Sequence, residues 1–194
     1  MPESPYIETF RAAGIRVVPC RFRRRFDSAA IRSLRSELGS TDYDIVHLLH
    51  NRPVSNGLRA LASFPRPKVV VYRGIVGNVS PWSPLSWFRY LHPRVDRIVC
   101  VAEAIRQYFL GLRPLGRRFP ADKPVTIHKG HDVAWYECEP ADLSQFDIPD
   151  DAFVIGCVAN MRPRKGVSVL VDAFSRLPAD MPIYLLLVGN MDSK

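Results

Sequence analysis

Short apolar runs, most of them β-branched, alternate along this chain with segments of helical spacing. The runs expected to form strands are 15–18, 45–49, 69–72, 98–101, 125–127, 153–159 and 183–188. The expected helices are 4–13, 29–38, 54–63, 102–110 and 167–177, and 78–87 is expected to be a loop. Continuous β-branched runs are typical of strands buried on both faces of a parallel sheet. The alternation therefore predicts an α/β fold with Rossmann-type parallel sheets.

An acidic stretch at 133–151, interrupted by Pro140 and Pro149, divides this pattern into two parts. We expect an α/β domain over 1–140, a linker over 141–152, and the first βαβ unit of a second Rossmann-type domain over 153–194. One βαβ unit cannot bury both faces of its strands. The sequence thus predicts that the second domain is incomplete within this chain.

Charge and composition narrow the class of protein. The 194 residues carry a formal net charge of +8, which predicts an anionic partner such as a phosphate, a lipid headgroup or a nucleic acid. No apolar run approaches the ~20 residues that cross a bilayer, and residues 1–5 lack the features of a secretory signal, so we expect a cytoplasmic protein. The four cysteines form no C-x-x-C pair, which favours structural thiols over a metal site or disulfides.

The strongest local charge feature is the run Arg21-Phe22-Arg23-Arg24-Arg25-Phe26. Such a run is most often an exposed loop. Its interleaved phenylalanines also suit an anionic membrane surface, and Arg21, Arg23, Arg24 and Arg25 are our candidate membrane contacts. Nucleic-acid binding is the competing interpretation, although the chain contains no recognised RNA motif.

The segment 160–166 stands between the expected strand 153–159 and the helix that begins at Val167. Ligands of parallel sheets bind beyond the carboxyl ends of strands, and helix N-termini favour anions. Arg162 and Lys165 add positive charge suited to a diphosphate. The alternative interpretation is a solvated basic turn.

This region carries a family resemblance. Residues 154–174 resemble the opening of the donor domain of family-4 glycosyltransferases, which have the GT-B fold: a strand, a turn with Arg162, then Lys165-Gly166, and Ala173-Phe174 on a helix. Residues 185–189 resemble the family's next strand, which ends in Val-Gly. The segments 43–47, 95–101 and 126–132 resemble upstream parts of the family more weakly, with Ala102 and Lys129 in place of the usual Ser and Asn.

The resemblance implies transfer of a sugar from a nucleotide diphosphate sugar to a hydroxyl group, with retention of configuration, no essential metal and no other cofactor. Arg162 and Lys165 would bind the donor diphosphate. The implied acceptor is a polysaccharide or a lipid-linked molecule in envelope polysaccharide or lipopolysaccharide synthesis, reached at the inner face of the cell membrane. The family's opening strand with its Gly-rich loop and its paired glutamates have no counterpart here, so we expect a chain incomplete at both ends.

Further candidates follow two strands of the first domain. His50 and Arg73 are the candidate catalytic residues. His50 follows 45–49 and is expected to face the cleft between the two domains and to orient or polarise an acceptor or donor hydroxyl. Arg73, at the end of 69–72, is expected to face the same cleft. Asn51, Gly74 and Asn78 are candidate acceptor or cleft residues. His47 is expected to be a core histidine, and Asp132 to cap its own turn.

Two other classes of function remain open at this point. One is a non-catalytic GT-B remnant that keeps the fold without turnover, which an assay of sugar-nucleotide transfer would separate from an enzyme. The other is a basic α/β module that binds membranes or nucleic acid, which steep salt dependence of binding would support. The sequence leaves the oligomeric state undetermined.

Overall fold

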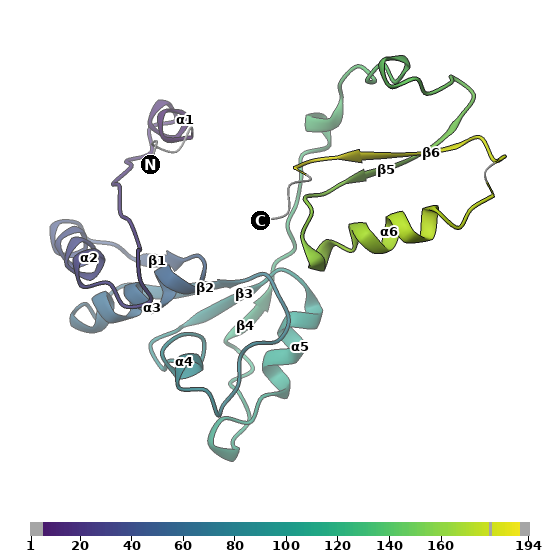
Figure 1. Cartoon of the computed structure of the whole chain (residues 1–194). Coiled ribbons are helices and arrows are strands. Elements are labelled where there is room, and N and C mark those ends of the chain that lie inside the picture. Colours follow the sequence, from purple (N-terminus) through teal and green to yellow (C-terminus); the bar gives the residue numbers. More distant parts are fainter. Residues whose placement is uncertain (1–5, 179, 191–194) are drawn as a thin grey trace. The chain divides into compact units, whose positions relative to one another are not determined.

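A computed structural model describes residues 6–178 and 180–190 of the chain (Figure 1). Its contacts divide the chain into two units, Met1–Gly130 and His131–Lys194. We call these the first and the second unit and describe each by itself.

The first unit is built on a four-stranded parallel sheet. Its strands are β1 (Ile45–Leu48), β2 (Lys68–Arg73), β3 (Arg97–Cys100) and β4 (Pro124–Thr126), in the order β1-β2-β3-β4. Val46 pairs with Val69 and Val71 with Ile98, which sets the register of β1, β2 and β3. The four predicted runs from 45 to 127 are therefore confirmed as strands of a parallel sheet.

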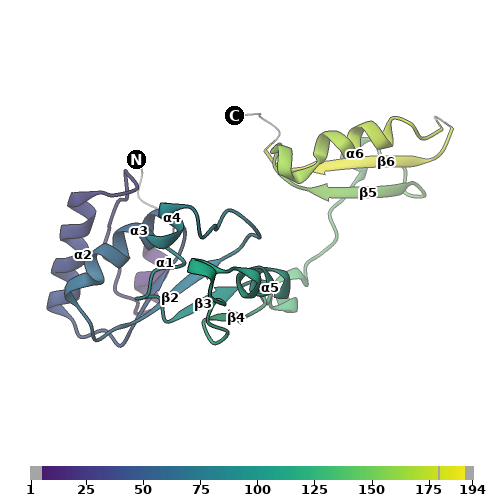
Figure 2. The same ribbon diagram turned by 90° about the horizontal axis from the view of Figure 1, so that it is seen from below.

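Helices connect and flank these strands (Figures 1 and 2). They are α1 (Ile7–Ala12), α2 (Ser28–Ser40), α3 (Asn51–Ala60), α4 (Pro84–Trp87) and α5 (Glu103–Gly111), with 3₁₀ turns at Leu61–Ser63 and Pro114–Gly116. The predicted helix at 4–13 is observed as α1, and residues 4 and 5 lie outside the described residues. Helix α3 begins at Asn51, three residues before the predicted start, so that it directly follows β1.

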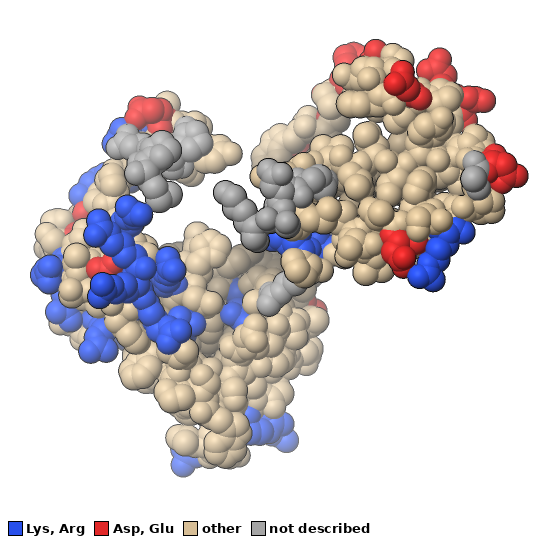
Figure 3. Space-filling view, viewed as in Figure 1, with Lys and Arg blue, Asp and Glu red and all other residues tan. Residues whose placement is uncertain are grey.

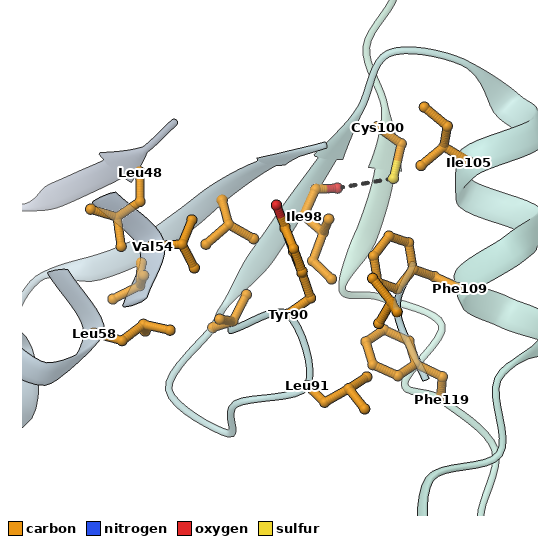
Figure 4. Packing of buried hydrophobic residues seen from close by; sticks show 14 of the residues in the cluster. Leu48, Val54, Leu58, Tyr90, Leu91, Ile98, Cys100, Ile105, Phe109 and Phe119 are labelled. Carbon is orange, nitrogen blue, oxygen red and sulfur yellow. Dashed lines mark hydrogen bonds between the residues drawn. The ribbon is translucent and has the colours of Figure 1, made fainter. Parts of the chain in front are cut away.

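The core of the first unit lies on one face of this sheet. Alternate residues of β2 are buried, with Val69 and Val71 fully enclosed, because successive side chains of a strand point to opposite faces. Figure 4 shows side chains from β1, β3, α3 and α5 meeting there. Phe109 of α5 is fully buried, and its ring centroid lies 5.6 Å from that of Phe119. Burying such an aromatic side chain contributes about 3 kcal/mol.

Three sequence predictions are wrong in this unit. Residues 15–18 form no strand, and Ile15 and Val18 stay exposed because no other segment that the structure describes pairs with them. The predicted loop at 78–87 contains the short helix α4, which begins at Pro84, a residue favoured in a first helical turn. His47 is exposed rather than in the core, since it lies on the outer face of the edge strand β1.

The second unit is one βαβ unit with a loop-rich entry. Strands β5 (Phe153–Val158) and β6 (Ile183–Val188) pair in parallel, and α6 (Val167–Phe174) lies along one face of the pair (Figures 1 and 2). The 3₁₀ turns are Val133–Tyr136, Ser144–Phe146 and Pro163–Lys165. The strands of this unit are not buried on both faces, since Phe153 is 67% and Val158 84% exposed. Two strands and one helix do not cover both faces.

Cysteine labelling offers a test of the first unit's core. Cys100 is buried on β3, and burial together with the nearby Glu103 carboxylate raises the pKa of its thiol to about 11. At pH 8 roughly one such thiol in a thousand is ionised. We therefore expect iodoacetamide to modify the exposed Cys138 and to leave Cys100 unmodified until the protein unfolds. Peptide mapping by mass spectrometry checks this, and equal rates at both cysteines would contradict the burial of Cys100.

Candidate functional site

The carboxyl ends of β1 and β2 bring four of the candidate residues together. His50 and Asn51 follow β1, and Arg73 and Gly74 stand at the end of β2. All four line one cavity of about 320 Å³, together with Tyr72 and Tyr90. Parallel strands place their carboxyl ends on one edge of the sheet, which is why residues from separate strand ends meet.

Two residues at this edge, His50 and Gly74, have an unusual backbone conformation or a close backbone contact. His50 is exposed and has φ 66°, a left-handed conformation that is uncommon for residues other than glycine. It directly precedes α3, and its side chain makes no capping hydrogen bond there. Gly74 lies under the ring of Tyr72, whose Cε1 would be 3.3 Å from a Cβ at this position. A side chain at position 74 would therefore press on that ring.

Arg73 is the buried charge of this site. Only 4% of it is exposed, because it shares the inward face of β2 with Val69 and Val71. Its Nε donates to the carbonyl of Ile75 at 3.0 Å, and Nη2 donates to the carbonyl of Gly77. Its guanidinium lies over the ring of Tyr90, 4.9 Å from the centroid, a distance typical of a cation–π contact. The side chain therefore fixes the loop that follows β2.

A second cavity of about 140 Å³ adjoins the first and shares Asn51, Arg73 and Tyr90 with it. Asn78, the fifth candidate residue, lines this second cavity, as does Arg89. The hydroxyl of Tyr90 donates to Asn51 Oδ1 at 3.0 Å, which connects the loop before β3 with the start of α3. His50 and Gly74 line the first cavity and are not among the residues that line the second.

The sequence predictions missed Arg89 and Tyr90. Both lie in the connection between β2 and β3, just after α4. No periodic pattern of apolar residues there predicts which side chains turn toward the sheet. The one available signal was an arginine within the aromatic stretch Trp87-Phe88-Arg89-Tyr90.

The arginine run 21–25 forms a surface over α3. The arginine side chains are exposed, and Figure 3 shows basic side chains gathered over α2, α3 and the segment between α1 and α2. The main chain of this run is held from below by Asn56, whose Nδ2 donates to the carbonyls of Arg24 and Arg25. The exposed-loop interpretation of the run therefore agrees with its observed position.

In the second unit, Arg162 and Lys165 follow the carboxyl end of β5. Both are exposed, and no hydrogen bond or ion pair joins either side chain to another described residue. Gly166, with φ 68°, ends the 3₁₀ turn and precedes α6, whose first turn lacks a side-chain cap. The uncapped N–H groups of that turn favour an anion. The buried Oδ1 of Asn160 also lacks a hydrogen-bond partner among the described residues.

The described residues contain no group of three or more His, Cys, Asp or Glu side chains placed to hold a metal ion. No helix within 6–178 or 180–190 has the length and apolar character needed to cross a membrane. Asp132 caps its own turn, as predicted, and its side chain accepts from the N–H of Ala134 at 3.1 Å.

Comparison with known proteins gives two findings. Residues 2–135 match the family described as Glycosyltransferase Family 4. The chain is also similar to a phosphatidyl-myo-inositol mannosyltransferase of Mycolicibacterium smegmatis, with 25% identity over 202 aligned residues that cover 98% of this chain. The aligned part is 50% of that relative, so the chain spans about half of its length.

Proposed function

We propose that this chain, which belongs to glycosyltransferase family 4, acts in the transfer of a sugar from a nucleotide diphosphate sugar to a hydroxyl acceptor. The observation that carries the proposal is the loop after β5. There Arg162 and Lys165 are exposed, unpaired among the described residues, and next to the uncapped start of α6. A diphosphate leaving group gains negative charge as the glycosidic bond breaks. Preorganised cations and N–H donors stabilise that charge.

The family resemblance extends the proposal to the type of reaction. We propose transfer of a hexosyl group with retention of configuration and without an essential metal. The relative is named as a mannosyltransferase, which makes mannose one sugar to include in the assay. The anomeric configuration of the product and the activity in EDTA are the measurements that check these two points.

The first test of the proposal removes the two cations. We expect Arg162→Ala with Lys165→Ala to weaken binding of a nucleotide diphosphate sugar by about 100-fold or more, because each charge-assisted phosphate contact is worth about 1.5–3 kcal/mol. Isothermal titration calorimetry with UDP-glucose and GDP-mannose measures this. Arg176→Ala is the matched control, since Arg176 is an exposed arginine of the same unit that pairs with Asp172. Unchanged affinity in the double variant, or no binding by the unmodified chain, would contradict the assignment.

We also propose that the acceptor is lipid-linked and that the arginine run contacts the anionic membrane surface that carries it. The relative's name includes phosphatidyl-myo-inositol, which is a lipid. We propose envelope polysaccharide or lipopolysaccharide synthesis as the process that uses such an acceptor. Arg23, Arg24 and Arg25 are exposed together with Phe26, which is 40% exposed. Basic residues near an anionic bilayer contribute about 1 kcal/mol each.

Vesicle binding tests the membrane proposal. We expect the triple variant Arg23→Gln, Arg24→Gln, Arg25→Gln to bind vesicles of phosphatidylglycerol and phosphatidylcholine about 100-fold more weakly, as measured by co-sedimentation. The control is Arg113→Gln, Arg117→Gln, Arg118→Gln, which removes the same charge from other exposed positions of the first unit. Equal losses in the two variants would show that net charge, rather than this surface, determines binding. Salt-dependent binding of RNA with no vesicle binding would favour the nucleic-acid interpretation.

A further inference from the structure

The second cavity of the first unit holds a buried positive charge that no carboxylate of the described residues neutralises. Arg73 is 4% exposed, and its hydrogen-bond partners are two backbone carbonyls. No described Asp or Glu forms an ion pair with it. Burying an ionised group is costly unless an opposite charge or several dipoles compensate. The two carbonyl dipoles and the Tyr90 ring supply only part of that compensation, because neither of these groups carries a net negative charge.

A second arginine lines the same cavity, again without an acidic partner among the described residues. Arg89 donates from Nε to the hydroxyl of Ser55 at 2.8 Å, and that hydroxyl in turn donates to the carbonyl of Asn51. Burial lowers the pKa of Arg89, and the charges of Arg25 and Arg73 lower it further. Cations that raise one another's energy in this way attract a shared anion.

The cavity has room and donors for such an anion. Its volume of about 140 Å³ is several times the ~30 Å³ that one water molecule occupies in the liquid. Asn78, Ser83 and Ser86 line it, and so does Asn51, the first residue of the ten-residue helix α3. The N–H groups of a first helical turn point outward along the axis and favour negative charge. Pro53 in that turn contributes no N–H of its own.

We propose that this cavity, which we call the arginine pocket, binds a phosphate monoester carried by the acceptor. Two guanidinium groups match the charge of about −1.5 to −2 that a phosphate monoester has at pH 7. The inference rests on the proposed sugar transfer and names the acceptor class, a phosphorylated molecule. The larger cavity next to the pocket, with His50 and Gly74 in its wall, would take the part of the acceptor that bears the hydroxyl.

Direct binding tests the pocket without any need for turnover. We expect sn-glycerol 3-phosphate to bind the full chain in calorimetry at low salt, and glycerol not to bind. Arg89→Gln is the informative variant, because Arg89 is only partly buried and Gln keeps a donor for Ser55, whereas changing Arg73 would release the loop after β2. We expect Arg89→Gln to weaken sn-glycerol 3-phosphate about tenfold or more, and Arg89→Lys, which keeps the charge, to recover part of the loss.

Variants of other arginines show whether sn-glycerol 3-phosphate binds in the arginine pocket or at the donor loop. Arg113→Gln removes an exposed arginine elsewhere in the first unit and should leave the affinity unchanged. No binding of sn-glycerol 3-phosphate, or equal affinity in Arg89→Gln and the unmodified chain, would overturn the pocket. Loss of its binding in the Arg162→Ala, Lys165→Ala variant would also overturn it, because the phosphate would then bind the donor loop. If nucleotide sugars fail to bind while Arg89→Gln still weakens glycerol phosphate, the sugar transfer fails and the pocket stands.

The source of the phosphate is assigned by competition. Vesicles that contain phosphatidic acid displace sn-glycerol 3-phosphate if the pocket takes a lipid headgroup. If such vesicles bind without displacing it, the acceptor is a soluble phosphate ester. Acetate and inorganic phosphate are compared as competitors of sn-glycerol 3-phosphate. If acetate displaces it at the same concentration as inorganic phosphate does, the assignment to a phosphate is overturned, because a singly charged carboxylate is then bound equally well.

Discussion

Replacing Gly189 with alanine is expected to open the end of the β5–β6 pair and to cost about 3 kcal/mol in the second unit. A Cβ built on Gly189 would lie 2.1 Å from the carbonyl oxygen of Ala159 and 2.8 Å from its carbonyl carbon. These are backbone atoms, which no side-chain rotation can move aside. Gly189 also has φ 143°, where a side chain is strained whatever the space around it.

The close approach at Gly189 holds the candidate donor loop in place. The N–H of Ala159 donates to the carbonyl of Val188 at 2.9 Å, and the N–H of Met161 donates to the carbonyl of Asn190 at 3.0 Å. These bonds continue the strand pairing beyond β5 to the residue before Arg162. If alanine at 189 separates the segments 159–161 and 188–190, we expect the candidate donor loop that contains Arg162 to lose its fixed position. Binding of nucleotide diphosphate sugars should then fall together with stability.

Hydrogen exchange by mass spectrometry measures the effect within the second unit alone. We expect peptides over 153–158 and 183–188 to lose protection in Gly189→Ala. Gly156→Ala is the matched control, because Gly156 lies in β5 and a Cβ there would meet no atom within 4 Å. Protection in Gly189→Ala equal to that in Gly156→Ala would show that the backbone contact is not required.

The strands were the part of the fold that the sequence predicted best. Runs such as 69–72 and 98–101 are apolar and β-branched because their strands are central in a sheet, and the structure places them in β2 and β3. Residues 15–18 have a similar composition, yet a strand needs a partner, and none of the described segments supplies one. Local pattern reports the tendency of a segment to be extended, whereas pairing is decided by the rest of the chain.

The site was predictable where it depends on topology. His50 and Arg73 line one cavity because each stands at the carboxyl end of a parallel strand, and that rule needs only the strand positions. The same rule says nothing about Arg89, which reaches the second cavity through the connection that contains α4. Nor does it reveal that Arg73 is buried without a carboxylate, because burial and pairing of a charge depend on the packing of several segments.

Asn56→Ala is the second change from which we expect a large effect, a loss of about 3 kcal/mol in the first unit. Asn56 is fully buried on α3 and uses both ends of its amide. Nδ2 donates to the carbonyls of Arg24, Arg25 and Arg52, and Oδ1 accepts from the N–H of Asp27 at 2.7 Å. Removing the amide leaves these groups without their partner, and each unsatisfied buried group costs about 1–3 kcal/mol.

The loss should extend to α2 through Asp27. The carboxylate of Asp27 caps this helix, accepting from Ala29 and Ala30 at 3.1 and 3.3 Å, and it also accepts from the N–H of Arg23. Backbone donation, first from Arg23, lowers the pKa of this carboxyl group. Asn56 thus positions a residue that holds both the start of α2 and the arginine run. We expect hydrogen exchange over 28–40 to accelerate in Asn56→Ala. The control is Ser36→Ala, a change at an exposed position of α2 itself, which should leave this exchange unchanged.

The same variant separates the charge of the arginine run from its conformation. Asn56→Ala keeps every arginine of the run and removes only the amide that holds its main chain against α3. If the ordered surface binds the membrane, Asn56→Ala should bind anionic vesicles several-fold more weakly at unchanged net charge. Asn56→Asp should act in the same direction, because one carboxylate oxygen would face three carbonyls to which Nδ2 now donates. Vesicle binding equal to that of the unmodified chain, with faster exchange over 28–40, would show that charge alone suffices and that the fixed conformation of the run serves the stability of the first unit.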